Sequence, residues 1–332
     1  MSDTITVIRA RRGKRLAKTV HADGRIEDYD EPKRFDLFSC QVSSLEALVR
    51  PLTKLLARPD CAVVRGVPID PARRLDVRRL AYADRKTGDP ATLEPAPHAW
   101  VALDMDRVER PAYVPADDLL ACAEIAIQRL PSVFRSAACI IQATASHGIK
   151  PGCRLRLWYW LDRLTSDGEM TRWLRRYPVD ASVFRTVQPI YTAAPIFNGC
   201  KDHLPCRIAV RPGIEAVAVP SAAALAPPPP KPIPPMPEPG DSRAARYAFA
   251  ALTHAATRVQ GTGEGGRHAQ ILKEARALGR FISAGLLTVE SVRATLVGAG
   301  TKAGKPEHEV ESIVGWALDH PSARPLPDGV RP

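Results

Sequence analysis

The sequence contains no apolar run long enough to span a bilayer, so we expect no membrane partner. A cluster of basic residues near its start is not followed by a hydrophobic stretch, and we therefore expect no secretory signal. The seven cysteines are scattered and odd in number, a pattern typical of reduced thiols and not of a disulfide framework. These absences predict a cytoplasmic protein. A Walker phosphate loop is also missing, so the sequence shows no helicase motif.

What the sequence does contain is positive charge and proline. The net charge is +11 and the pI is about 9.5, a balance that favours polyanions such as nucleic acid and nucleotides. Many of the 32 prolines fall late in the chain, and residues 227–239 predict a polyproline II spacer that cannot build a core. We therefore expect a catalytic-looking domain over 1–212, a proline-rich linker over 213–241 and a helical domain over 242–322.

Hydrophobic periodicity predicts alternating strands and helices in the first of these parts. The expected strands cover residues 4–8, 61–66, 98–106, 137–144, 154–162 and 190–197. The expected helices cover residues 43–57, 118–130 and 169–176. This order favours an α/β or α+β domain built on a mixed sheet. The C-terminal part predicts a small all-α bundle, with helices over residues 243–259, 267–284, 289–298 and 306–319.

The strongest chemical signal is an acid pair, Asp104 and Asp106, at the end of a mostly apolar strand. Residues i and i+2 of a strand point to the same face, so the two carboxylates share one side of a sheet. Burying two uncompensated carboxylates costs on the order of several kcal/mol. A bound divalent cation removes that cost. Mg²⁺ in particular is held by one or two carboxylates together with substrate phosphates. The alternative is a turn whose acids are merely solvated.

Polar and basic residues follow the neighbouring strands and could complete a site. These residues are Ser146, His147, Lys150, Arg154, Arg156, Arg185 and Arg207. A third acid is supplied by Asp180 or by Asp162, of which we prefer Asp180. Carboxylates that hold Mg²⁺ or Mn²⁺, and arginines that grip a triphosphate, are the groups needed for nucleotidyl transfer.

At these residues the sequence resembles the archaeo-eukaryotic-type primases, the primase-polymerase superfamily, of plasmids, phages and integrated elements. The first acidic motif of that family is similar to residues 103–106, the second to residues 144–147 and the third to Val179-Asp180. Residues 265–280 resemble the helical domain that commonly follows such cores. The resemblance covers most of residues 95–320, whereas the first 90 residues match no motif.

The resemblance implies an RRM-like sheet and a DNA primase that makes short RNA or DNA primers on single-stranded DNA. It implies that Asp104, Asp106 and Asp180 are catalytic and bind Mg²⁺ or Mn²⁺, and that the Ser-His loop and the basic residues bind nucleoside triphosphates. A replicative helicase in another chain would be its partner. The family separates the Ser and His of its second motif by one residue, but here they are adjacent, so either His147 or Arg156 fills that role.

Two other functions fit the same residues. A single-stranded DNA-binding replication initiator on a primase-like fold would bind DNA without chemistry, and a metal-dependent nuclease would use the same acids to cleave it. Trp158 and Trp160, on the face of Arg154 and Arg156, could either stack on bases or belong to the core.

Overall fold

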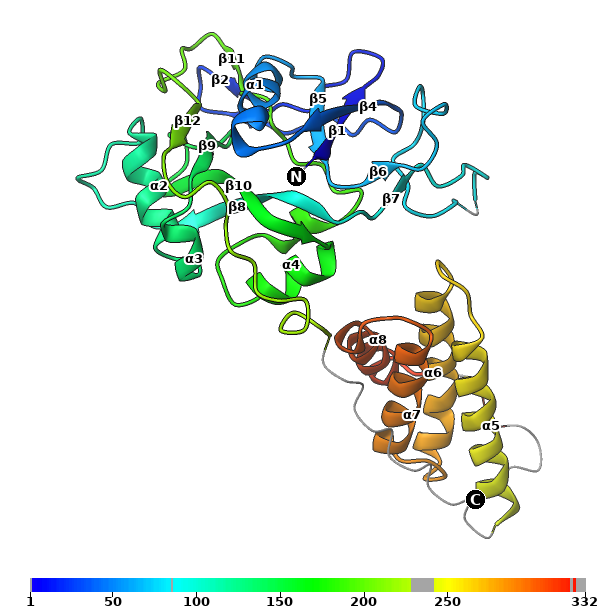
Figure 1. Ribbon diagram of the computed structural model, residues 1–332. Helices are drawn as coiled ribbons and strands as arrows, with labels where there is room; N and C mark the ends of the chain where they lie inside the picture. Colours follow the sequence, from blue (N-terminus) through cyan, green and yellow to red (C-terminus); the bar gives the residue numbers. More distant parts are fainter. Residues whose placement is uncertain (1, 85, 228–241, 323–324, 327–332) are drawn as a thin grey trace. The chain divides into compact units, whose positions relative to one another are not determined.

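The computed structural model describes residues 2–84, 86–227, 242–322 and 325–326 (Figure 1). It divides into two compact units, Met1–Pro227 and Pro228–Pro332. The predicted linker therefore begins too early, because Ile214 bridges to Ala137 and the buried Val217 bridges to Leu161. The proline-rich stretch at 228–241 lies outside the described residues.

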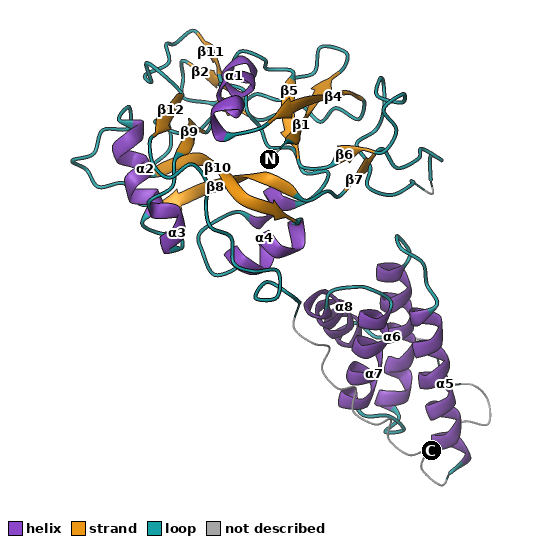
Figure 2. Cartoon of the chain, viewed as in Figure 1, coloured by secondary structure: helices purple, strands orange, loops and turns teal. Residues whose placement is uncertain are grey.

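The first unit combines helices with several small sheets, as predicted for the α+β class (Figure 2). Its central sheet has the order β12-β9-β10-β8. The strands are β8 (His98–Val108), β9 (Cys139–Ala143), β10 (Cys153–Thr165) and β12 (Ile208–Arg211). All its pairs are antiparallel, which corrects the prediction of a mixed sheet. The physical reason is that β9 and β10 are joined by a short loop, which requires them to run in opposite directions.

The segment that connects β8 to β9 is helical. Its helices are α2 (Leu119–Ile127) and the short α3 (Ser132–Arg135). Both β8 and β9 pair antiparallel with β10, so they run parallel to each other on either side of it. The acid pair lies in the C-terminal half of β8, next to the first residues of β10.

The N-terminal residues build a second sheet of order β4-β1-β5, and α1 (Leu45–Leu56) connects β4 to β5. Its strands are β1 (Asp3–Ala10), β4 (Phe35–Val42) and β5 (Cys61–Val64). The hydroxyl of Ser44 accepts a hydrogen bond from the backbone N–H of Ala47 at 3.1 Å and so caps α1.

Short strands complete this unit. They are β2 (Thr19–His21), β3 (Ile26–Glu27), β6 (Val67–Pro68), β7 (Leu93–Glu94) and β11 (Ile196–Asn198). The strand predicted over 190–197 is mostly wrong, since only β11 and an isolated bridge from Ile190 to Val63 form there. Pro189 and Pro195 interrupt this stretch, and proline cannot donate a hydrogen bond to a strand ladder.

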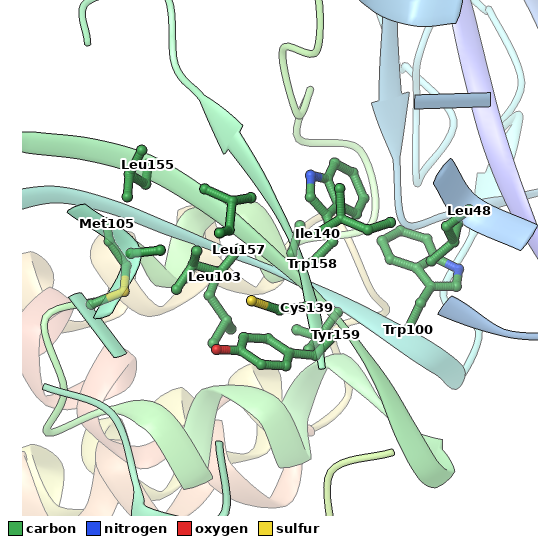
Figure 3. Close-up of a cluster of buried hydrophobic side chains, with 14 of the residues drawn as sticks. Leu48, Trp100, Leu103, Met105, Cys139, Ile140, Leu155, Leu157, Trp158 and Tyr159 are labelled. Carbon is green, nitrogen blue, oxygen red and sulfur yellow. The ribbon is translucent and has the colours of Figure 1, made fainter. Parts of the chain in front are cut away.

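The core of the first unit lies on both faces of β8 and β10, and Figure 3 shows its aliphatic and aromatic side chains together with Leu48 of α1. Trp158 is fully buried and Trp160 is 5% exposed. The indole N–H of Trp158 donates to Gln142 Oε1 at 3.1 Å. Both tryptophans are therefore core residues and not base-stacking surfaces.

In the described part of the second unit, four helices form close to the predicted ranges, and the third of them runs four residues further than predicted. They are α5 (Arg243–Gln260), α6 (Arg267–Ser283), α7 (Val289–Lys302) and α8 (Glu307–Asp319). Each contributes to one hydrophobic core, with Leu252, Phe281, Leu296 and Val314 as examples from successive helices. No helix of the described chain is long and apolar enough to cross a membrane.

A buried carboxylate in the N-terminal sheet should make stability depend on pH. Asp36 accepts hydrogen bonds from Arg9 at 2.6 Å, Arg11 at 2.8 Å and the backbone N–H of Asp76 at 3.0 Å. Burial alone would raise its pKa, but these donors lower the pKa to about 2. A lowered carboxylate pKa contributes stability above the unfolded-state value of about 3.9, and this stability is lost as the pH falls toward 2.

We expect Asp36→Asn to lower the free energy of unfolding by roughly 1–2 kcal/mol at pH 7, because the two arginines are partly exposed. Denaturant unfolding of both proteins at neutral pH and near pH 2 tests this. The difference should shrink in acid, and a difference that does not change with pH would contradict the prediction.

Candidate functional site

The site is organised around an ion pair between neighbouring strands. Asp104 of β8 lies directly opposite Arg156 of β10, and Asp104 Oδ2 accepts a hydrogen bond from Arg156 Nη2. The side chains are 12% and 5% exposed, respectively. Asp104 Oδ1 and Arg156 Nε are buried without a hydrogen-bond partner among the described residues. The pair therefore retains an acceptor that a ligand could use.

Asp106 lies two residues further along β8, on the same face as Asp104. The residue as a whole is exposed, although neighbouring groups partly desolvate its carboxylate. Partial burial of the carboxylate and the charge of Asp104 raise the pKa of Asp106, and Asp180 adds to this rise while Arg154 and Arg156 oppose it. At Asp106, burial and the two neighbouring carboxylates together thus outweigh the two arginines. This is the electrostatic condition that a bound cation relieves.

The third acid is held beside this pair by the backbone. The N–H of Asp180 donates to the carbonyl of Asp104 at 3.0 Å. Its side chain caps a 3₁₀ helix, Ala181–Phe184, because both carboxylate oxygens accept hydrogen bonds from Ser182 at 2.8 Å. Asp162 lies about 20 Å from the acids, given ~3.3 Å per residue along β10. It accepts from Val219 N–H instead, so the structure brings Asp180 and not Asp162 to the site.

The side chains at this site supply only some of the ligands that a divalent cation needs. Asp104 offers an unpartnered buried oxygen and Asp106 an exposed carboxylate, which are the hard oxygen ligands that Mg²⁺ and Mn²⁺ prefer. Asp180 would have to release Ser182 before it could join them. Within the described ranges, no group of three or more His, Cys, Asp or Glu is arranged to hold a metal ion. The acid pair is therefore the minimal candidate metal centre.

His147 does not have the role predicted for it. Its side chain is fully buried, and its Nδ1 accepts a hydrogen bond from the backbone N–H of Arg154 at 3.1 Å. The other ring nitrogen, Nε2, lies 2.8 Å from the carbonyl oxygen of Ala116 and must carry the proton that this contact needs. Both nitrogens are occupied by the backbone, so His147 joins two loops and cannot bind a nucleotide.

Arg207 is also unavailable to a nucleotide. It forms a bidentate ion pair with Asp202 at 2.6 and 2.8 Å, and it donates to the carbonyl of Thr144 at 3.1 Å. The sequence did not show this because the pair closes within a loop whose conformation depends on β9. Arg207 therefore fixes the end of β9, and we withdraw it from the nucleotide-binding set.

The remaining basic residues are better placed. Arg154 lies near enough to Asp106 to lower its pKa, and Lys150 and Arg185 are exposed. Ser146 is half-buried, and its carbonyl accepts from the N–H of Lys150 at 2.9 Å. Of these residues, Arg154 is the one whose charge acts on Asp106. Arg156 is the second-motif candidate that touches the acids, whereas His147 does not.

Tyr29 and Tyr191 were not among the residues predicted for the site. Their rings are stacked, with centroids 3.6 Å apart and an interplanar angle of 3°. The carbonyl of Tyr191 accepts a hydrogen bond from Arg156. Burial raises the pKa of Tyr29, Arg156 opposes this, and Asp104 and Asp106 raise the pKa further. The hydroxyl of Tyr29 thus remains a neutral donor near the acids and is supplied by the N-terminal residues that matched no motif.

If His147 only joins the loops, then its removal should affect stability more than ligand binding. We expect His147→Ala to cost about 2–3 kcal/mol, because the N–H of Arg154 and the carbonyl of Ala116 lose their partner. Denaturant unfolding would measure this cost, and titration with a fluorescent nucleoside triphosphate below the unfolding midpoint would measure affinity. A large loss of nucleotide affinity with unchanged stability would restore the original prediction.

Comparison of the chain with protein-family models, curated proteins and solved structures finds no match. The assignment of function therefore depends on the chemistry of the site.

Proposed function

We propose that this protein is a template-directed nucleotidyltransferase, a DNA primase that makes RNA or DNA primers on single-stranded DNA during replication of a mobile element. The observation that carries the proposal is the acid pair, Asp104 and Asp106, in the C-terminal half of β8, with Asp180 tied to the same strand. Arg154 and Arg156 come from the adjacent strand. Binding of a metal–triphosphate substrate requires acids for the metal and arginines for the phosphates, and these two neighbouring strands supply both.

The fold supports the proposal. The order β8–α2–β9–β10, with β10 in the middle, is the β–α–β–β arrangement expected of an RRM-like sheet. Here β12 is added next to β9. The four-helix second unit corresponds to the expected C-terminal bundle. A replicative helicase would act from another chain, and a cytoplasmic location suits these partners.

The residues take the following roles in this proposal. Asp104 and Asp106 hold Mg²⁺ or Mn²⁺, and Asp180 is the third acid. When bound, the metal would activate the attacking 3′-hydroxyl and neutralise the leaving pyrophosphate. Lys150, Arg154 and Arg185 attract and orient the triphosphate, with the guanidinium groups able to grip two oxygens at once. Arg156 holds the carboxylate of Asp104 in place.

The alternative is a single-stranded DNA-binding initiator without chemistry. One observation favours it, namely that Arg156 already neutralises Asp104, as a permanent internal cation would. Such a protein would bind DNA with a strong dependence on salt and no dependence on metal.

One experiment separates these functions. The protein is incubated with labelled nucleotides, a single-stranded template and Mn²⁺, and the products are separated on a gel. We expect new oligonucleotides that require template and metal. Degradation of the template would indicate the nuclease, and template binding without incorporation would indicate the initiator. Either of these results would overturn the proposal.

A further inference from the structure

An aromatic side chain is displayed to solvent in the loop that leaves the strand of the acid pair. Aromatic residues make up only 6% of the sequence, yet Tyr113 is 85% exposed. It lies in the loop that joins β8, the strand of the acid pair, to α2. A tyrosine in this position gains nothing from burial, so its contribution to the free energy of folding is small.

The loop around Tyr113 is fixed to the protein. The N–H of Val114 donates to the carbonyl of Pro111 at 3.0 Å, and the side chain of Val114 is buried. Arg110 donates to the carbonyl of Val114. Further along, Asp118 caps α2 through the N–H of Ala121 at 2.9 Å. Tyr113 thus lies on a turn that is anchored on both sides. Because the turn is already ordered, binding a partner costs little conformational entropy.

His147 connects this loop to its neighbour. Its Nε2 contacts the carbonyl of Ala116, and its Nδ1 accepts from the N–H of Arg154. The two loops also meet at Gly152, where an added Cβ would lie 2.7 Å from the carbonyl oxygen of Val108. Only glycine allows this approach, and its φ of +88° requires glycine as well. The buried histidine and this glycine therefore hold Tyr113 at the acid end of the sheet.

The charges nearby indicate what this loop binds. Glu109 and Asp117 make the loop of Tyr113 itself acidic, whereas the exposed Lys150 and the half-buried Arg154 belong to the loop and strand that His147 ties to it. A partner with an aromatic face for Tyr113 and negative charge for Lys150 and Arg154 is single-stranded nucleic acid, whose bases stack on exposed aromatic side chains. The net charge of +11 favours the same partner.

We propose that Tyr113 is a stacking platform for a base of single-stranded DNA. The inference rests on the proposed function for the identity of the strand as a template. Stacking of a base on an aromatic side chain contributes about 1–3 kcal/mol, which corresponds to roughly 5- to 150-fold in affinity.

Fluorescence anisotropy of a labelled oligothymidine, with EDTA present and no nucleotide, tests the platform separately from catalysis. We expect Tyr113→Ala to weaken binding about tenfold or more, given that range for one stacked base. Tyr113→Phe should bind like the wild type because the ring face is retained. Tyr113→Trp should also bind, and its indole emission should be quenched by the oligonucleotide. Phe38→Ala, which removes a partly exposed aromatic on β4, is the control and should change nothing.

Because Tyr113 is exposed, the three Tyr113 variants should unfold at the wild-type temperature. Unchanged affinity in Tyr113→Ala would overturn the inference, as would an indole that is not quenched. The outcome is independent of the primer assay. If the protein makes no primers but Tyr113→Ala weakens DNA binding, the proposed function fails and this inference stands. If the protein makes primers but Tyr113→Ala binds DNA like the wild type, this inference fails and the proposed function stands.

Discussion

Replacement of Asp106 by Asn is expected to abolish nucleotide incorporation without destabilising the protein. Asp106 has no hydrogen bond or ion pair with a described residue, so the substitution leaves no buried partner behind. It removes one of the two carboxylates that would hold the cation, and loss of such preorganised charge typically lowers the rate by at least about 100-fold. Incorporation of labelled nucleotide on single-stranded DNA measures the loss.

The stability of this variant has a defined pH dependence. Asp106 has a raised pKa in the folded protein, so its charged form is disfavoured by folding. A raised carboxylate pKa means that stability is greatest below the unfolded-state value, about 3.9, and is lost as the pH rises through the folded-state value. Asp106→Asn should therefore unfold at a higher temperature than the wild type at pH 7, and the two should converge at about pH 3. A lower unfolding temperature at pH 7 would show that Asp106 has a structural partner.

The opposite result is expected for Asp104, although it is only two residues away. Asp104→Ala leaves Arg156 buried with the carbonyl of Tyr191 as its acceptor. Breaking one side of a buried ion pair typically costs about 3–5 kcal/mol, because the remaining charge is uncompensated. This variant should be both inactive and strongly destabilised, as denaturant unfolding would show.

A double variant separates these two effects. Asp104→Leu combined with Arg156→Met removes both charges and replaces them with apolar side chains of similar size. We expect it to recover most of the lost stability, since such replacements are often neutral or stabilising. It should remain inactive, because a metal ligand is still missing. Lys305→Ala breaks a partly exposed ion pair with Glu309 and is the matched control, with an expected cost under about 1 kcal/mol. A double variant as unstable as Asp104→Ala would show that the ion pair is not the cause.

The elements that the sequence predicted are those whose pattern is local. The helices α5 to α8 have apolar residues at helical spacing, and β8 and β10 are long apolar strands, so their burial follows from periodicity. Strand β4 was missed because only its first three residues and its last are buried, which breaks any alternation. Strand β12 was missed because it has four residues and none is fully buried.

The site was predictable to the extent that it depends on a single strand. Asp104 and Asp106 lie two residues apart on β8, and Asp104 is close enough to Asp106 to raise its pKa. That Arg156 lies opposite Asp104 depends on the register between β8 and β10, which the sequence does not reveal. The structural use of His147 and Arg207 depends on loops that meet only in the folded chain. Tyr29 approaches the acids from the N-terminal residues, far away in sequence, for the same reason.

The central claim is that the acid pair of β8 binds a divalent cation, and a titration of Mn²⁺ followed by electron paramagnetic resonance tests it most directly. Free Mn²⁺ gives a signal that binding removes, so the measurement does not require activity. We predict that the wild type binds Mn²⁺ and that Asp106→Asn binds it at least about tenfold more weakly, since one of the carboxylate ligands is lost. Asp162→Asn, at the far end of β10, should bind like the wild type. Equal Mn²⁺ affinity in the wild type and in Asp106→Asn would contradict the claim.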